Sequence, residues 1–262
     1  MRMCDAIIAA KGSSVRVPRK NLIDIGGKPL VVQNILQAQE TKQISRVWVT
    51  TEDDEIAEVS ERAGARIIWR PDWMNDTHSG NEPFVDAIQQ IRAVHEMDLV
   101  VLMLPTKVLR LPGDFDRLID AYNQMPVVDG KTNRASFVIP RGDVSMYTDI
   151  GNHRCELIYN EMDDKLLEHT GGCYCSTWQE IIKFHKQMCE LLGEDHPTDK
   201  AHNDFCRKAI KEGLRGSEAM PWHADIVAWV PVEWWQSRDI DIPSDVEEMR
   251  EAWDAFMPKD KT

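Results

Sequence analysis

The sequence predicts an α/β fold in which helices cover both faces of a mostly parallel central sheet. Segments with strand and helix patterns alternate through the first half of the chain, an order typical of parallel sheets. Residues 98–104 form a nearly continuous apolar run, as expected of a strand buried on both faces. With 262 residues, the chain is long enough for one large domain with its own core.

Each element of the first half follows from its residue pattern. Residues 3–10 are apolar and too few for a helix, which indicates a buried strand. Apolar residues spaced by three or four indicate helices, and apolar runs between turn residues indicate strands. By these criteria we expect a brief pairing at 23–25 and a turn at 26–29, strands at 46–51, 65–69, 98–104 and 135–139, and helices at 31–38, 53–63, 81–95 and 114–124.

The pattern becomes irregular after residue 140. The expected elements of this part are short strands at 156–160 and 172–176, helices at 177–192 and 202–212, a strand at 226–232 and a helix at 243–256. We therefore expect a single domain over residues 1–262. Within it, residues 141–225 would form a divergent lobe or insertion, and residues 226–262 would return to the main sheet.

The composition argues against several classes of partner. With 31 basic and 44 acidic residues, the formal net charge is −13, which disfavours nonspecific binding to nucleic acid. No apolar stretch approaches the roughly 20 residues that a membrane span needs, and no signal peptide is recognisable. The six scattered cysteines are interpreted as reduced thiols. We expect a cytoplasmic protein without nucleic-acid or membrane partners.

A basic loop follows the first expected strand. Residues 12–14 are small and leave backbone N–H groups able to face an anion. Neither the P-loop pattern nor G-x-G-x-x-G is present. The loop is a candidate triphosphate cradle, and the alternative is a solvated basic loop without a ligand. Its small residues are Gly12, Ser13 and Ser14, and its cations are Lys11, Arg16, Arg19 and Lys20.

The carboxylates of Asp239 and Asp241 form the second candidate site. Two carboxylates separated by one residue point the same way in an extended segment. Oxygen ligands of this kind suit Mg²⁺, which also binds substrate phosphates. The alternative is that both are surface charges before a helix that Ser244 or Asp245 caps.

Three loops are expected at the same edge of the sheet. Residues 11–20, 50–54 and 105–110 each follow the carboxyl end of an expected strand. Ligands of open parallel sheets bind at this edge. These loops could therefore share one crevice.

Several segments, taken in order, resemble the motifs of a known family. Residues 10–21 read A-K-G-S-S-V-R-V-P-R-K-N, close to A-R-G-G-S-K-R-I-P-R-K-N. Further matches are G-G-K-P-L at 26–30, V-T-T-E-D-D-E-I-A at 49–57, R-P at 70–71 with D-T at 76–77, L-P-T-K-V-L-R at 104–110, and D-I-D-I-P-S-D at 239–245. The chain thus resembles the acid-sugar cytidylyltransferases, the family of N-acylneuraminate cytidylyltransferase (CMP-sialic acid synthetase).

This resemblance implies a fold and an activity. The fold would be a three-layer Rossmann-like nucleotidyltransferase fold with a small additional lobe. The enzyme would couple CTP to the anomeric hydroxyl of an acidic sugar, a sialic-acid-like nonulosonate or a related 2-keto acid sugar. The products would be a CMP-sugar and pyrophosphate, the cofactor would be Mg²⁺, and two copies would form a homodimer.

The resemblance also implies roles for individual residues. Lys20 would contact the triphosphate, and Asp239 and Asp241 would hold Mg²⁺. Residues 70 and 76–79 would lie near the cytidine, and position 104 near the sugar. The substrate-binding residues implied are Lys11, Gly12, Ser13, Ser14, Arg16, Asn21, Arg70, Asp76, Thr77, Ser79, Leu104 and Thr106.

Departures from the motifs keep other functions open. Lys11 and Val15 stand where the family has arginine and lysine, Leu104 where it has a sugar-contacting glutamine, and Lys107-Val108 where it has Ser-Pro. An arginine-to-lysine change at a phosphate site is not conservative, because the bidentate fork is lost. One alternative is a nucleotidyltransferase of the same fold with a different sugar or nucleotide. Another is a catalytically silent relative that binds nucleotide or serves as a scaffold.

Two other groups of residues favour packing over binding. Cys173 and Cys175 could suggest zinc, but their C-x-C spacing departs from the usual pair, and we expect small buried side chains. Strand alternation predicts that Trp229 belongs to the core. Trp234 or Trp235 could border the sugar pocket.

Overall fold

The computed structural model describes residues 3–74, 81–129, 133–140, 144–149, 155–161, 167–198, 200–201, 204–205, 207–208, 212 and 226–258. In this part of the chain, no helix has both the length and the apolar composition required to cross a bilayer.

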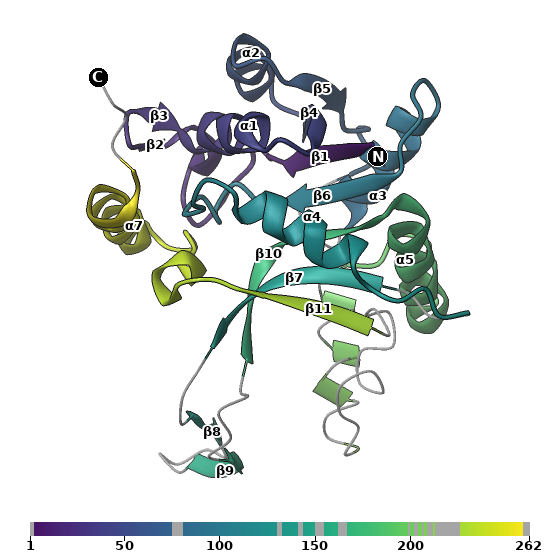
Figure 1. Ribbon diagram of the computed structural model, residues 1–262, viewed down its shortest axis with the longest axis vertical. Helices are drawn as coiled ribbons and strands as arrows, with labels where there is room; N and C mark the ends of the chain where they lie inside the picture. Colours follow the sequence, from purple (N-terminus) through teal and green to yellow (C-terminus); the bar gives the residue numbers. More distant parts are fainter. Residues whose placement is uncertain are drawn as a thin grey trace.

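A seven-stranded sheet forms the centre of the molecule (Figure 1). Its strand order is β11-β7-β10-β6-β1-β4-β5. β1 pairs in parallel with β4 and β6, as do β4 with β5 and β11 with β7, whereas β10 is antiparallel to both of its neighbours. The sheet is therefore mostly parallel, as predicted. The strands are β1 (Cys4–Ala9), β4 (Ile44–Thr51), β5 (Arg66–Trp69), β6 (Leu99–Met103), β7 (Asn133–Pro140), β10 (Leu167–Thr177) and β11 (Ile226–Pro231).

Helices cover both faces of this sheet. α1, α2 and α4 contribute to one apolar cluster with the sheet, and α3 and α5 contribute to a second. β1 shows the division directly, since Ala6 and Ile8 belong to the first cluster and Ile7 to the second. The helices are α1 (Leu30–Glu40), α2 (Asp54–Arg62), α3 (Glu82–Arg92), α4 (Asp114–Asn123), α5 (Trp178–Leu192) and α7 (Pro243–Phe256).

Short elements link the sheet to its edges. The 3-10 helix η1 (Lys20–Leu22) follows the basic loop, and η3 (Trp234–Ser237) precedes α7. The hairpin of β2 (Asp24–Ile25) and β3 (Lys28–Pro29) contacts α7. A third apolar cluster joins α7 and η3 to the strand-end loops through Trp235, Ile240 and Met249, which pack with Val108 and Leu109. The C-terminal helix is thereby fixed beside the loops that are expected to bind substrate.

The boundary of the expected lobe differs from the prediction. Residues 141–225 include β10, which lies between β7 and β6 in the main sheet, and α5, which packs against α3. The small sheet of β8 (Val144–Asp149) and β9 (Cys155–Glu161) lies below the main sheet in Figure 1. Cys173 and Cys175 of β10 are fully buried, and this packing explains why β10 belongs to the core. The helix expected at 202–212 falls largely outside the described residues.

The prediction that Trp229 is a core residue is wrong. Its side chain is 45% exposed, because α4 packs on the face of β11 that carries Val230 and Trp229 lies on the opposite face of this edge strand. A strand at the edge of a sheet carries the same residue alternation as an interior strand, so the pattern alone does not distinguish them.

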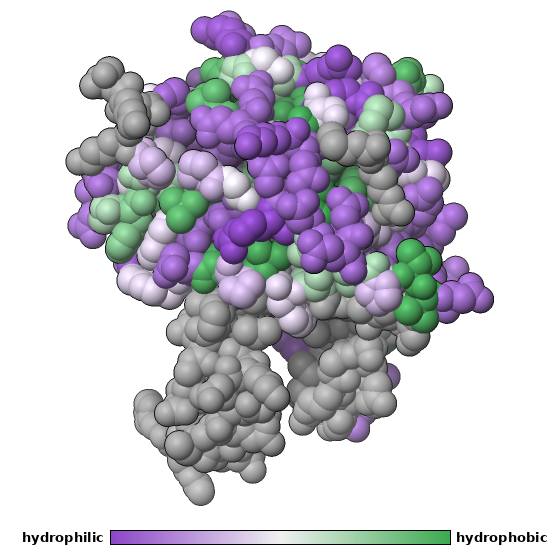
Figure 2. Space-filling view, viewed as in Figure 1, coloured by the Kyte–Doolittle hydropathy of each residue, from purple (hydrophilic) through white to green (hydrophobic). Residues whose placement is uncertain are grey.

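Elsewhere, polar side chains cover most of the main body in the view of Figure 2.

Candidate nucleotide and metal site

Three loops at the carboxyl ends of β1, β4 and β6 are linked through one another and through the segment that precedes α7. Hydrogen bonds between side chains and backbone join them across the sequence. The loop after β1 contacts both the loop after β4 and residues 240–241. The loop after β6 contacts residues 236–239. The structure thus brings together the segments from which the sequence predicted a common crevice.

The basic loop is closed at its base by buried contacts. Asn21 is 3% exposed, and its Nδ2 donates to the carbonyl oxygen of Lys11 at 2.8 Å. Arg19 adopts the left-handed conformation with φ 54°, which is unusual for a residue with a Cβ. Its guanidinium makes a two-pronged ion pair with Asp53 and also pairs with Glu55. The Asn21 hydrogen bond joins the two ends of the loop, and the Arg19 ion pairs fix its second end at the N-terminus of α2.

A carboxylate already binds the N–H groups of this loop. The N–H of Gly12 donates to Glu52 Oε1 at 2.7 Å, and the N–H of Ser13 donates to the same oxygen at 3.4 Å. Convergent backbone N–H groups of this kind form anion sites. The hydroxyl oxygen of Ser14 is buried and has no partner among the described residues. The arrangement fits an anion larger than the single carboxylate oxygen of Glu52.

Position 12 has room only for glycine, because its Cα lies close to the side chain of Asp53. A Cβ at this position would lie 2.3 Å from Asp53 Oδ2, well inside van der Waals contact. Asp53 cannot retreat freely, because its carboxylate caps α2 by accepting from the N–H of Ile56 at 2.9 Å and also pairs with Arg19. The small residue of the motif therefore has a steric basis.

Lys20 connects the basic loop to the carboxylate segment. Its Nζ donates to the carbonyl oxygen of Ile240 at 2.7 Å. Burial lowers the pKa of its ammonium, while the nearby carboxylates of Asp239 and Asp241 act in the opposite direction. Lys20 therefore lies beside both members of the predicted carboxylate pair.

The two carboxylates have different surroundings. Asp239 Oδ2 lies 3.2 Å from Lys107 Nζ, and its Oδ1 accepts from the N–H of Ile240 at 2.8 Å. Burial tends to raise the pKa of Asp239, but the Lys107 ammonium and a hydrogen bond with Thr106 leave the pKa below its usual value. Asp241 pairs with Arg16 at 3.0 Å, and both side chains are more than half exposed.

The residues present fit a magnesium ion. In the described part of the chain, no three His, Cys, Asp or Glu side chains cluster in a way that could hold a metal by themselves. Mg²⁺ does not need such a cluster, because it commonly takes one or two carboxylates together with phosphates and water. The exposed pair of Asp241 and Arg16 is easily opened, since surface ion pairs contribute little. Asp241 could therefore offer an oxygen ligand next to a triphosphate.

Three further predicted residues, Arg70, Leu104 and Thr106, are at least partly buried at the ends of β5 and β6. Arg70 is 7% exposed, donates to the carbonyl oxygen of Thr50 at 3.1 Å and lies 3.4 Å from Glu52 Oε2. Leu104 packs against the apolar cluster of α3, and Thr106 is 8% exposed beside Asp239. Asp76, Thr77 and Ser79 lie outside the described residues.

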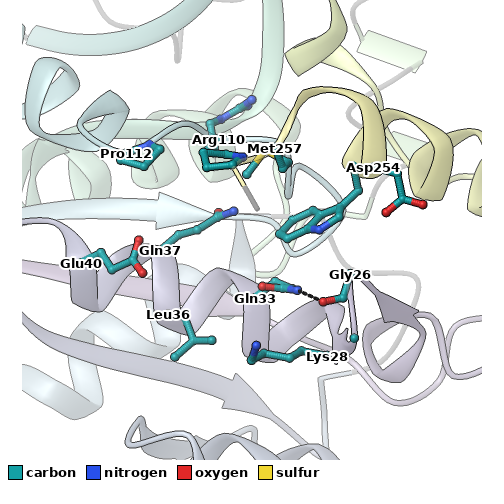
Figure 3. A pocket seen from close by; sticks show the side chains of 13 residues that line it. Gly26, Lys28, Gln33, Leu36, Gln37, Glu40, Arg110, Pro112, Asp254 and Met257 are labelled. Atoms are coloured by element: carbon teal, nitrogen blue, oxygen red, sulfur yellow. Dashed lines mark hydrogen bonds between the residues drawn. The ribbon is translucent and has the colours of Figure 1, made fainter. Parts of the chain in front are cut away.

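A cavity of about 690 Å³ lies between α1 and α7. Figure 3 shows Gln33 and Gln37 on α1, with Pro112 and Met257 across from them. None of the predicted site residues lines it, and it shares Arg110 and Pro112 with the connection from β6 to α4. The cavity is therefore not the crevice that the sequence predicted.

Comparison with known proteins identifies the family. A family model described as Cytidylyltransferase matches residues 6–170. The chain belongs to the cytidylyltransferase family. Among its relatives, the 3-deoxy-manno-octulosonate cytidylyltransferase of Bradyrhizobium sp. (strain ORS 278) is 36% identical over 110 residues, which are 42% of this chain and 39% of the relative. The CMP-N,N'-diacetyllegionaminic acid synthase of Legionella pneumophila is 30% identical over 120 residues, 45% of this chain and 52% of the relative.

The aligned region covers about half or less of the length of these relatives. A solved structure of CMP:2-keto-3-deoxy-manno-octonic acid synthetase complexed with CTP shares the fold, with a TM-score of 0.64 and 18% identity over 97% of this chain and 99% of that one. The predicted fold class and the resemblance to acid-sugar cytidylyltransferases are confirmed.

Two contacts of this cytidylyltransferase were not predicted from its sequence. Glu52 occupies the N–H groups of the basic loop, although its position 40 residues away gave no signal. Lys107 was noted as a departure from the family motif, and its Nζ reaches the predicted metal ligand Asp239. For the Lys107 contact, the sequence offered one signal: position 107 carries a lysine where the family motif has a serine.

Proposed function

We propose that this cytidylyltransferase couples CTP to the anomeric hydroxyl of an acidic sugar, giving a CMP-sugar and pyrophosphate. The observation that carries the proposal is the contact of Lys20 with Ile240, which joins an anion-binding loop to a carboxylate segment. A transferase of nucleotidyl groups needs a triphosphate cradle and a site for the counter-cation side by side. The names of the relatives support CTP and an acidic sugar as the substrates.

In the proposed reaction, the anomeric oxygen attacks the α-phosphorus of CTP. A new oxygen–phosphorus bond forms, the bond from the α-phosphorus to the bridging oxygen breaks, and pyrophosphate leaves while the hydroxyl proton passes to solvent. The N–H groups of Gly12 and Ser13 would transfer from Glu52 to the phosphates. Together with the Lys20 ammonium, they would stabilise the charge that develops on the departing pyrophosphate.

Mg²⁺ is proposed as the cofactor, held at the segment that carries Asp239 and Asp241. When bound, it would neutralise phosphate charge and act as a Lewis acid on the α-phosphate. The protein's own part is positioning: Asp245 accepts from the N–H groups of Asp241 and Ile242 at 2.7 and 2.9 Å, and thereby orients the carboxylate segment at the start of α7.

The acceptor is proposed as a nonulosonate or a related 2-keto acid sugar. Leu104 lacks the hydrogen-bonding amide that the family's motif places at this position, so the sugar side differs from the sialic acid enzymes. A homodimer and a cytoplasmic location rest on the resemblance and on the composition, and they stay predictions. Light scattering would test the dimer.

A thermal-shift panel of nucleotides with Mg²⁺ tests the proposal. A ligand at 100 times its Kd stabilises the folded state by about 2.7 kcal/mol. We expect CTP to stabilise more than UTP, ATP or GTP, and Lys20→Ala to reduce this shift. Lys183→Ala, which changes an exposed lysine of α5, should not reduce it. Preference for UTP or ATP would select another nucleotidyltransferase, and no shift with any nucleotide would favour a silent scaffold.

A further inference from the structure

Lys107 is a buried cation that contacts the carboxylate segment, residues 237–241. It follows β6 on the central part of the sheet and is 7% exposed. Its Nζ donates to the carbonyl oxygen of Ser237 at 2.8 Å and lies 3.2 Å from Asp239 Oδ2. A buried ammonium needs a charged partner and hydrogen-bond acceptors, and this lysine obtains both from residues 237–239.

Both carboxylate oxygens of Asp239 have partners. Oδ2 faces Lys107 and Oδ1 accepts from the N–H of Ile240. Thr106 adds a further hydrogen bond to this carboxylate. A divalent cation that took Asp239 as a ligand would have to approach a buried ammonium within a few ångströms, where like-charge repulsion is strong.

Asp241 has an exposed ion-pair partner where Asp239 has a buried one, and the Lys20 ammonium acts on both carboxylates. The partner of Asp241, Arg16, is 68% exposed and the pair spans 3.0 Å at the surface. An exposed ion pair opens at little cost in free energy. The two carboxylates that look equivalent in the sequence are therefore unequal in the structure.

We propose that the Lys107 ammonium is a built-in cation of this site, which holds Asp239 in place and leaves Asp241 as the carboxylate that binds a divalent metal. The proposal rests on the proposed function, because it concerns the metal of that reaction. Lys107 is a positioning residue here: it joins the loop after β6 to the segment before α7 and neutralises one carboxylate permanently. A serine at this position would leave Asp239 available to the metal.

Binding of Mn²⁺ to the nucleotide-free protein, followed by electron paramagnetic resonance, tests this division of roles. We expect Lys107→Ser to tighten Mn²⁺ binding about fivefold or more, because it exposes a second carboxylate. The same substitution in an Asp239→Asn background should give no such gain. Asp241→Asn should remove binding in the wild-type background, and Lys107→Arg, which keeps the charge, should leave the affinity close to that of the wild type.

Equal effects of Lys107→Ser with and without Asp239 would overturn the proposal, since they would show a general charge effect and no competition for that carboxylate. Absence of any tightening, or of Mn²⁺ binding by the wild-type protein at millimolar concentration, would overturn it as well. Lys107→Met serves as a second variant if Lys107→Ser does not fold, as judged by circular dichroism. Because this measurement contains no nucleotide or sugar, failure of the proposed function would appear in the thermal-shift panel and not here.

Discussion

The Nζ atom of Lys20 donates a hydrogen bond of 2.7 Å to the carbonyl oxygen of Ile240, a residue 220 positions away. This contact ties the end of the basic loop to the segment that carries Asp239 and Asp241. A phosphate that bound at the loop would therefore lie next to the carboxylates, as a metal-assisted transfer of a nucleotidyl group requires.

Substitution of Lys20 tests its proposed role at the triphosphate. We expect Lys20→Ala to lower kcat about 100-fold or more, because a charge that stabilises the leaving pyrophosphate is lost. The KM for the acidic sugar should change much less. Steady-state kinetics measure both quantities, with Lys183→Ala as the control for the loss of a surface lysine. A larger effect on the KM for the sugar than on kcat would place Lys20 on the sugar side.

Asp241→Asn should abolish Mg²⁺-dependent turnover and leave the fold intact. The side chain pairs with exposed Arg16, so we expect the melting temperature to change by no more than about 2 °C. Asp254→Asn, which changes an exposed carboxylate of α7, is the matched control. Unchanged turnover in Asp241→Asn would refute its assignment as a metal ligand.

Gly12→Ala should remove the stabilisation that CTP gives. The added Cβ would lie 2.3 Å from Asp53 Oδ2, so the loop must move away from Glu52 and from its observed conformation. Because Gly12 lies in a loop outside the apolar clusters, the melting temperature without ligand should fall little. A normal shift with CTP in Gly12→Ala would show that this loop does not bind the nucleotide.

Glu52→Gln should strengthen nucleotide binding. The carboxylate accepts from the N–H groups of Gly12 and Ser13, and its charge would repel a triphosphate. Removing one negative charge near the site should tighten the Kd for CTP about three- to tenfold. Isothermal titration calorimetry measures this, and Glu58→Gln on the exposed side of α2 should have no effect. Weaker binding in Glu52→Gln would indicate that the carboxylate organises the loop for its ligand.

The lowered pKa of Asp53 leads us to expect that the stability of the fold depends on pH. Hydrogen bonds from Arg19, followed by those of the α2 N-terminus, lower the pKa of Asp53. At pH values between this lowered pKa and the ordinary aspartate pKa, the unfolded state binds more protons than the folded state. Stability therefore rises with pH in this range. This contribution is complete above about pH 4 and is lost as the pH falls through the lowered pKa.

Asp53→Asn should remove this dependence. Asparagine can keep the cap but not the ion pair with Arg19, so we expect a loss of about 1 kcal/mol or less in the free energy of unfolding at pH 7 and a shallower fall in acid. Urea denaturation between neutral and acid pH measures both. A steep acid limb that persists in Asp53→Asn would assign the dependence to other carboxylates.

Much of the fold was predictable because its elements have local causes. The apolar runs of β1 and β6 are buried in the sheet, and Asp53 begins α2 as a cap. Conversely, Trp229 was misassigned because exposure at a sheet edge depends on which strands pair. The inclusion of β10 in the main sheet, antiparallel to β6 and β7, also depends on such pairing.

The sequence predicted which segments form the candidate site but not which side chains contact one another within it. The position of each loop after a strand indicates a shared edge, which the structure bears out for the loops after β1, β4 and β6. The partners within that edge come from distant positions: Glu52 reaches Gly12 across 40 residues, and Lys107 reaches Ser237 across 130. The pairing of β1 with β4 brings Gly12 to Glu52, and the packing of α7 and η3 against the loop after β6 brings Lys107 to Ser237. No local pattern encodes either arrangement.

Pyrophosphate release is the measurement that tests the proposed function most directly. CTP, UTP, ATP and GTP would each be incubated with Mg²⁺ and a set of 2-keto acid sugars, with and without the sugar. We expect release that requires both CTP and an acidic sugar, accompanied by one equivalent of CMP-sugar. Release with UTP or ATP in preference to CTP, or no release with any sugar, would contradict the assignment.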